Sequence, residues 1–186
     1  MVTVRDVIAL AAANMGREDL AAAVNSQSEQ PSEETESLLR SYRLVENEVA
    51  LDYFPLKAKE TFNIGKGKLP YADFSNAPVN VTRVTGAGGE ELAFEYYPDH
   101  LRLPEKTRGS VTVEYSFAPA EKGLGDATSF PDKISARLLA AGVCAEFCLS
   151  RGQFAEAAVW EGRFYDALRA ASIPRRRVTV RSRRWV

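Results

Sequence analysis

The sequence predicts an α+β fold that is mainly α-helical, with a small inserted antiparallel β subdomain and an extended C-terminal arm. Apolar residues recur at helical spacing in the first and last thirds of the chain. In the middle third, apolar and polar residues alternate with the period of two that is typical of strands. The final segment, "SIPRRRVTVRSRRWV", contains six arginines and no acidic residue. We therefore expect an N-terminal helical region over 1–55, a β subdomain over 56–120, a C-terminal helical hairpin over 121–173 and a basic arm over 174–186.

Two short helices and one long helix are predicted in the first region. Thr3 can cap a helix over "VRDVIALAAANM" that ends at Gly16, and a second helix is expected in "REDLAAAV". Ser32 can cap a longer helix whose acidic first turn suits the helix dipole and which runs to about Phe54, before Pro55. Such a helix has more surface than one small core can cover, so we expect part of it to face another chain.

Period-two segments rich in Val, Thr, Phe and Tyr follow, and they predict the β subdomain. They are "KAKETFNI", "VNVTRVTG", "ELAFEYY" and "SVTVEYSFAP". The second and third form a candidate hairpin that turns at Gly86–Gly89. Another turn at Pro98–Asp99 is expected to lead into a further short strand.

Helical spacing returns after the loop "AEKGLGDATS". Pro131 suits a first helical turn, and the following apolar stripe comprises Ile134, Leu138, Ala141, Ala145 and Leu149. Gly142 costs that helix about 1 kcal/mol unless close helix packing uses its missing side chain. A last helix follows Gly152, presents Ala157, Trp160, Phe164 and Leu168 on one face, and closes before Pro174.

No combination of residues indicates catalysis, so we predict no enzyme activity, no cofactor and no metal site. Gly65–Lys68 and Gly86–Gly89 lack the spacing of phosphate-binding loops and are interpreted as hairpin loops. His100 follows a Pro–Asp turn with no nucleophile motif nearby. Cys144 and Cys148, four residues apart on a helix, are expected to be buried, reduced thiols.

The sequence argues against two further classes, membrane-spanning proteins and secreted proteins. The chain has no run of apolar residues long enough to span a membrane, and its first residues lack the features of a secretory signal, so we expect a cytoplasmic protein. The overall charge is −1, but the last fifteen residues carry +6, which leaves −7 on the rest. A protein that binds a phosphate backbone is expected to be basic over its body too. The asymmetry therefore favours an arm that docks on an acidic protein surface, including one on another copy of the chain.

The C-terminal half resembles structural proteins of bacteriophage morphogenesis clusters, and the plan of the whole chain resembles the head–tail connector adaptors, especially the tail tubular adaptors of short-tailed phages. The residues that carry the resemblance are Gly142–Val143, Glu146–Phe147, Gly152, Glu156–Ala157, Trp160, Arg163–Phe164–Tyr165, Ala167–Leu168 and Arg183–Arg184–Trp185. The resemblance implies a virion protein that is assembled in the host cytoplasm. It also implies a ring of twelve copies that contacts the portal protein and a tail or nozzle protein, with DNA passing through the lumen without sequence reading.

We expect the basic arm to be the partner-binding segment, with Trp185 as its apolar anchor. Its predicted contact residues are Arg175, Arg176, Arg177, Val178, Val180, Arg181, Arg183, Arg184 and Trp185. Two alternatives remain open for this segment: a disordered solubilising tail, and a nucleic-acid contact that would make the chain a nucleic-acid-binding protein.

Overall fold

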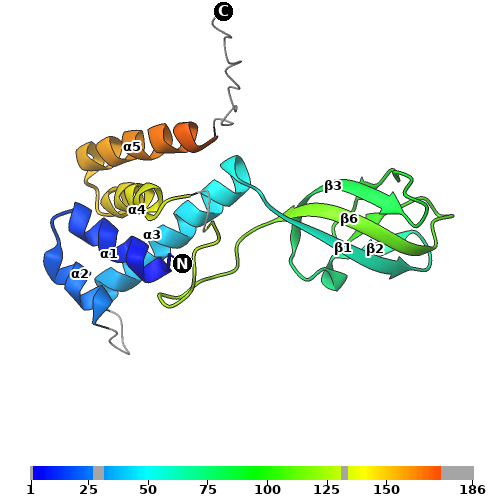
Figure 1. The fold of residues 1–186 in the computed structure, drawn as a ribbon, viewed down its shortest axis with the longest axis horizontal. Coiled ribbons are helices and arrows are strands. Elements are labelled where there is room, and N and C mark those ends of the chain that lie inside the picture. Colours follow the sequence, from blue (N-terminus) through cyan, green and yellow to red (C-terminus); the bar gives the residue numbers. More distant parts are fainter. Residues whose placement is uncertain (1, 27–31, 131–133, 173–186) are drawn as a thin grey trace, which may run out of the picture.

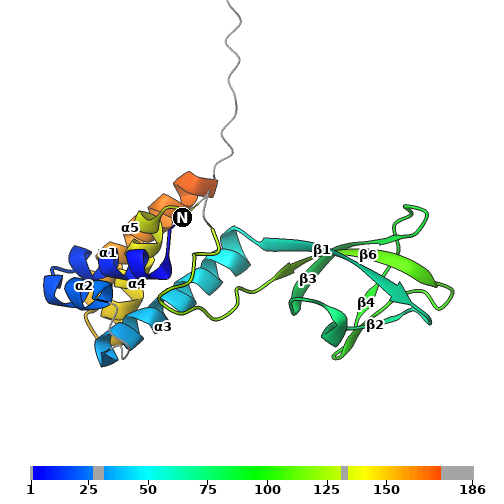
Figure 2. The ribbon, with the colours of Figure 1, turned by 60° about the horizontal axis from the view of Figure 1, so that its bottom comes forward.

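The computed structural model describes residues 2–26, 32–130 and 134–172. Within these residues, five α-helices form one lobe and six strands form a second lobe, which extends away from the helices (Figure 1; Figure 2). Each lobe has its own cluster of buried apolar side chains. The predicted class, a mainly helical α+β fold, is confirmed.

The helical lobe is arranged around one central helix. It comprises α1 (Val4–Asn14), α2 (Glu18–Asn25), α3 (Glu33–Glu48), α4 (Ala136–Ser150) and α5 (Phe154–Ser172). Helix α4 packs against α1, α3 and α5, and so lies between α5 and the N-terminal helices (Figure 1). Every residue from Leu138 to Cys144 is buried, because neighbours cover this helix on several sides.

The predicted helix starts in the first region are confirmed by local hydrogen bonds. Thr3 and Asp6 form a reciprocal capping box, with each side chain accepting from the other residue's backbone N–H at 3.2 and 2.9 Å. Ser32 accepts from the Thr35 N–H at 3.2 Å and so caps α3. Gly16, at φ +72°, follows the end of α1 in the left-handed conformation that glycine adopts without strain.

The end of the long helix differs from the expectation. The α-helical part of α3 stops at Glu48, and the remaining turn, η1 (Val49–Tyr53), is π-helical. Its wider ring is closed by the Phe54 N–H, which donates to the Val49 carbonyl at 2.7 Å. The chain then passes Pro55 into the β lobe, as predicted.

The predicted start of the next helix is wrong. Helix α4 begins at Ala136, with Ser135 as its N-cap, and Pro131 lies outside the described residues. Of the expected apolar stripe, Ile134, Leu138 and Ala141 are buried, but Leu149 is half exposed. The single-stripe prediction failed because other helices surround α4, so that it buries apolar side chains on several faces.

The β lobe contains two three-stranded antiparallel sheets instead of the single predicted sheet. Their strand orders are β1–β6–β3 and β2–β5–β4. The strands are β1 (Leu56–Ile64), β2 (Lys68–Pro70), β3 (Pro78–Gly86), β4 (Glu95–Tyr96), β5 (His100–Arg102) and β6 (Gly109–Phe117), with a 3₁₀ turn, η2 (Tyr71–Asp73), after β2.

The candidate hairpin between "VNVTRVTG" and "ELAFEYY" is present only next to its turn. The Gly86 N–H donates to the Glu90 carbonyl at 2.9 Å, and the Leu92 N–H donates to the Val84 carbonyl at 2.9 Å. Beyond Leu92 the chain leaves β3, which pairs with β6, whereas β4 pairs with β5 through the predicted turn at Pro98–Asp99. The Gly65–Lys68 segment joins strands of different sheets, so its interpretation as a hairpin loop is wrong.

The segment between β6 and α4 runs back along the first helix. Backbone N–H groups of Val4 and Arg5 donate to the carbonyls of Asp126 and Leu124 at 2.9 and 3.0 Å. The same segment also contacts Glu46 of α3, whose side chain is only 1% exposed.

One carboxylate oxygen of Glu46 joins three groups. It accepts from the Tyr42 hydroxyl at 2.7 Å and from the Ser129 N–H at 2.8 Å, and it lies 3.2 Å from the Lys122 ammonium. Burial, and then the bond to Glu46, raises the pKa of Tyr42 well above its ordinary value. The network therefore fixes the returning segment to α3.

Candidate interaction surface

The predicted partner-binding residues, from Arg175 to Trp185, all lie outside the described residues. The described part of the chain supplies candidate surfaces that they or other partners can meet. These surfaces lie on the helical lobe, around α5.

Helices α3, α4 and α5 meet closely at Gly142. A Cβ atom placed on Gly142 would lie 2.8 Å from Val45 Cγ1 and 2.9 Å from the ring of Phe164, so only glycine allows this approach. The close helix packing that would offset the cost of this glycine is therefore present. On the surface above it, residues of all three helices line a shallow depression of about 60 Å³.

Three carboxylates surround this depression, one from each helix: Glu48, Glu146 and Glu161. The Tyr165 hydroxyl donates to Glu48 at 2.9 Å, and this bond is the main cause that raises the pKa of Tyr165 to about 12. Burial, followed by the charges of Glu48 and Glu161, raises the pKa of Glu146. Among the residues that the structure describes, no cationic side chain lies within 4.0 Å of these three carboxylates.

Apolar side chains lie exposed beside the carboxylates. Leu149, on the last turn of α4, lines the depression and is 50% exposed. Leu44 is 54% exposed and stands one helical turn before Glu48, on the same side of α3. The exposed ring of Tyr53 lies 6.4 Å from that of Tyr165. We call this mixed acidic and apolar surface the α3–α4–α5 face; it comprises Leu44, Glu48, Tyr53, Glu146, Leu149, Glu161 and Tyr165.

Helix α5 leaves most of its own surface uncovered. Only Ala157, Phe164 and Leu168 of its nineteen residues are buried. Phe154, at the start of the helix, is 69% exposed, and Val159 is also exposed. Trp160, predicted for the buried face, is only partly buried.

A groove of opposite character runs along the other side of α5. It has a volume of about 730 Å³ and is lined by Arg137, Arg163 and Trp160, with one acidic residue, Asp166. The Arg163 guanidinium lies 4.6 Å from the centre of the Trp160 ring, a cation–π contact. Ala170 and Ala171 also line this groove, so it reaches the point where the basic arm leaves the helix.

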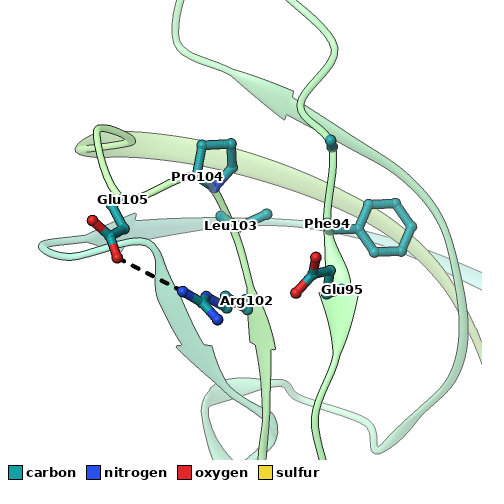
Figure 3. A pocket seen from close by; sticks show the side chains of 7 residues that line it. Phe94, Glu95, Arg102, Leu103, Pro104 and Glu105 are labelled. Carbon is teal, nitrogen blue, oxygen red and sulfur yellow. Dashed lines mark ion pairs between the residues drawn. The ribbon is translucent and has the colours of Figure 1, made fainter.

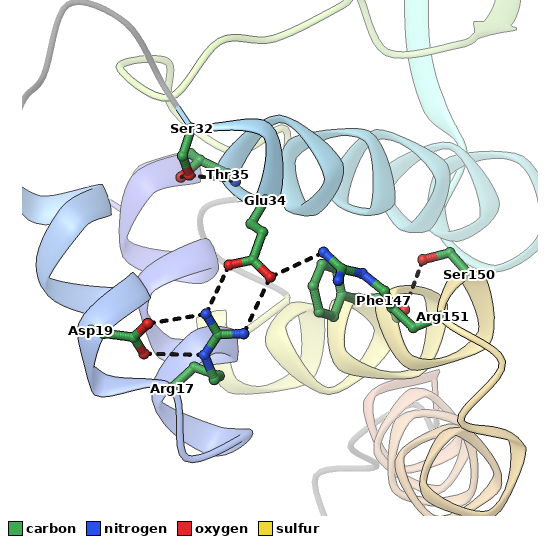
Figure 4. Close-up of polar contacts among 8 residues, drawn as sticks. All are labelled: Arg17, Asp19, Ser32, Glu34, Thr35, Phe147, Ser150 and Arg151. Carbon is green, nitrogen blue, oxygen red and sulfur yellow. Dashed lines mark hydrogen bonds and ion pairs between the residues drawn. The ribbon is translucent and has the colours of Figure 1, made fainter.

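A charged cluster at the C-terminal end of α4 is structural, because its charges are already paired (Figure 4). Glu34 on α3 accepts from Arg17 at 2.7 Å and from Arg151 at 3.1 Å, and Arg17 also pairs with Asp19. The hydrogen bond from Arg17 is the main cause that lowers the pKa of Glu34. The Arg151 guanidinium lies over the Phe147 ring, as Figure 4 shows. The cluster thus ties α2, α3 and α4 together.

His100 is the first residue of β5, and its ring contacts the turn that precedes this strand. Its Nδ1 lies 2.6 Å from Asp99, whose other oxygen pairs with Lys68 at 3.3 Å, and its ring stacks on Tyr97. The hydrogen bond to His100 is the main cause that lowers the pKa of Asp99. These contacts stabilise the β4–β5 turn.

A third hollow, of about 450 Å³, lies in the β lobe (Figure 3). Its charged lining residues are Glu95, Arg102 and Glu105, and Arg102 pairs with Glu105 at 3.7 Å. Its remaining lining residues, Ala93, Phe94, Leu103 and Pro104, offer neither a nucleophile nor a titratable base.

The two cysteines are buried and free, as predicted. The Cys144 thiol donates to the Ala11 carbonyl at 3.4 Å, and burial raises its pKa to about 12. Burial also raises the pKa of Cys148. Because the thiolate is the reactive form, both groups are poor nucleophiles in the folded chain.

Residues 2–26, 32–130 and 134–172 contain neither a candidate metal site nor a candidate membrane span. These segments contain no cluster of three or more His, Cys, Asp or Glu side chains that could hold a metal ion. None of their helices combines the length and the apolar character needed to cross a bilayer. No protein-family model matches the chain, and no curated protein matches it.

Sequence reasoning did not identify the α3–α4–α5 face. One of its carboxylates lies on α3 and the other two lie about a hundred residues later, on the consecutive helices α4 and α5. Each one alone has the pattern of an ordinary solvated residue. One signal was available: Leu44 stands outside the buried helical spacing of Leu38, Tyr42, Val45 and Val49.

Proposed function

We propose that this chain is a structural subunit of a bacteriophage virion: a head–tail connector adaptor that forms a ring between portal and tail. The observation that supports it best is the uncovered surface around α5. A helix of nineteen residues with three buried side chains, beside exposed Leu44, Leu149 and Phe154, is typical of a surface that another subunit covers.

The two-lobed shape supports the same role. The helical lobe offers separate acidic and basic sides along α5, so neighbouring copies can meet head to tail through different surfaces. Contacts of this heterologous kind close into rings when the rotation between copies is an integral fraction of a turn. The β lobe, which projects from the helices, is then free for a second contact within the particle (Figure 2).

The net negative charge of the chain outside its basic arm is consistent with the wall of a channel for DNA. Outside the last fifteen residues the chain carries −7, and a wall of the same sign as the phosphate backbone offers no strong binding site. In this proposal DNA passes along the ring without being held, and the basic arm contacts a protein.

Imaging of purified particles tests the proposal. A chain labelled on the β lobe should appear at the junction of capsid and tail as several symmetry-related copies. Absence of the label from that junction, or one copy without symmetry-related neighbours, would contradict it.

A second candidate function, nucleic-acid binding, is favoured by the basic groove. Arg137, Arg163 and the stacked Trp160 extend the positive charge of the arm onto the helical lobe. This alternative predicts that the purified chain retains DNA, that retention weakens steeply with salt, and that Arg137→Gln/Arg163→Gln weakens it further. A connector adaptor should show little retention in the same filter-binding assay.

A further inference from the structure

We propose that the basic arm of a second copy, residues 175–186, docks on the α3–α4–α5 face. This inference rests on the proposed function, because it takes the occupant from a neighbouring subunit. It names the surface that receives the arm, and so identifies a subunit–subunit contact in addition to any contact with portal or tail.

Charge complementarity is the first argument. Three carboxylates converge on the face from three helices without a cationic partner among the described residues. Burial, followed by the charges of Glu48 and Glu161, raises the pKa of Glu146. The arm carries six arginines and no acidic residue. Guanidinium groups between Glu48, Glu146 and Glu161 would relieve the repulsion among the carboxylates and can form bidentate hydrogen bonds with them.

The pattern of the arm provides the second argument. In extended backbone, alternate side chains share one side. One side of the arm would then present Arg181, Arg183 and Trp185 together, and the other would present Val178 and Val180. On such a side, Arg181 and Arg183 can meet the carboxylates of the face while the indole of Trp185 meets the exposed Leu149.

The apolar part of the face gives Trp185 a place to pack. Leu149 is half exposed, and Ala145 and Ala157 line the same depression without large side chains of their own. Burying the indole against Leu149 removes apolar surface of both groups from water, and aromatic side chains are favoured in such contacts.

The length of the arm sets how far it can extend from α5. Fourteen residues follow the end of α5 at Ser172. In extended form they span up to about 46 Å, at about 3.3 Å per residue. The basic groove, which is lined by Arg137 and Arg163, extends to Ala171 near the end of α5, and its like charge disfavours docking of the arm in that groove.

Disulfide trapping between two full-length variants tests the contact. One variant carries Leu149→Cys on the face and the other carries Val186→Cys beside the anchor. The native Cys144 and Cys148 are buried, so they should not compete. Mixing the two variants under mild oxidation after nuclease treatment should give a disulfide-linked dimer that contains one chain of each.

Matched variants separate this contact from general charge attraction. Glu48→Gln/Glu146→Gln/Glu161→Gln on the Leu149→Cys chain should abolish the mixed dimer. Glu95→Gln/Glu105→Gln/Glu121→Gln, which neutralises three exposed carboxylates elsewhere, should leave it unchanged. Arg181→Gln/Arg183→Gln on the Val186→Cys chain should also abolish it, and that change does not alter the fold of the face.

Four results would overturn the proposal: no mixed dimer; an equal yield when Val79→Cys, exposed on the β lobe, replaces Leu149→Cys; a dimer that forms only before nuclease treatment; or a bond formed only within single chains of the Leu149→Cys/Val186→Cys double variant. The last result would place the arm on its own chain.

Particle imaging tests the connector role independently of this contact. A chain found at the head–tail junction without a mixed dimer refutes only the arm contact. A mixed dimer from a chain that is absent from the junction refutes only the connector role.

Discussion

Replacing Gly142 by alanine should destabilise the helical lobe, although alanine is the better helix former. The helix preference alone would stabilise the chain by about 1 kcal/mol. The new methyl group, however, would lie 2.8 Å from Val45 Cγ1 and 2.9 Å from Phe164, and both of these side chains are buried with little room to move. Overpacking of this kind costs about 2 kcal/mol, so we expect a net loss of about 1 kcal/mol.

Gly162 provides a matched control. It also lies inside a helix, α5, but a Cβ atom there would meet nothing within 4 Å. Gly162→Ala should therefore stabilise the chain by up to about 1 kcal/mol, and the difference between the two variants, about 2 kcal/mol, isolates the packing cost.

Urea unfolding followed by the helical circular dichroism signal measures both variants, since that signal comes from the helical lobe. If the free energy of unfolding falls with urea concentration at the same slope in both variants and in the parent chain, the changes act on stability and not on the extent of unfolding. If Gly142→Ala stabilises the chain as much as Gly162→Ala does, then α3, α4 and α5 do not meet as described.

Three other predictions concern buried and paired groups. Glu46→Ala should cost about 3 kcal/mol in urea unfolding, because it leaves the Lys122 ammonium partly buried without its carboxylate; a smaller loss in Glu46→Ala/Lys122→Met would confirm that cause. The lowered pKa of Glu34 means that its contribution to stability is present above its ordinary value of 4.5 and is lost as the pH falls through the folded value. Thermal unfolding at several acidic pH values should therefore vary less with pH in Glu34→Gln. Cys144 and Cys148 should resist a thiol-reactive chromophore at neutral pH and should both react in urea; rapid reaction of the folded chain would contradict their burial.

Local features of the fold were predictable because they depend on residues close together in the chain. The Thr3–Asp6 capping box, the Ser32 cap and the glycine stop at Gly16 each involve fewer than five residues. Their residue types alone indicate where a helix begins or ends.

Strand pairing was not predictable in the same way. The period-two pattern located β1, β3 and β6, but it contains no information about which strand lies beside which. The sequence predicted that β3 would pair with the segment after Gly89, whereas β3 lies beside β6, some thirty residues further along the chain. The π-helical turn at Val49–Tyr53 also escaped prediction, because its spacing over five residues resembles that of an ordinary helix.

The amino-acid sequence by itself determined the order of the helical and β regions, the capped starts of α1 and α3, and the separation of a basic final segment from an acidic body. Only the tertiary structure decided that Glu48, Glu146 and Glu161 gather around one depression beside Leu149. The physical reason is the close approach at Gly142, where α3 packs against the consecutive helices α4 and α5, about a hundred residues further along the chain. Periodicity within each helix gives the direction of its side chains, but not the neighbouring helix that those side chains meet.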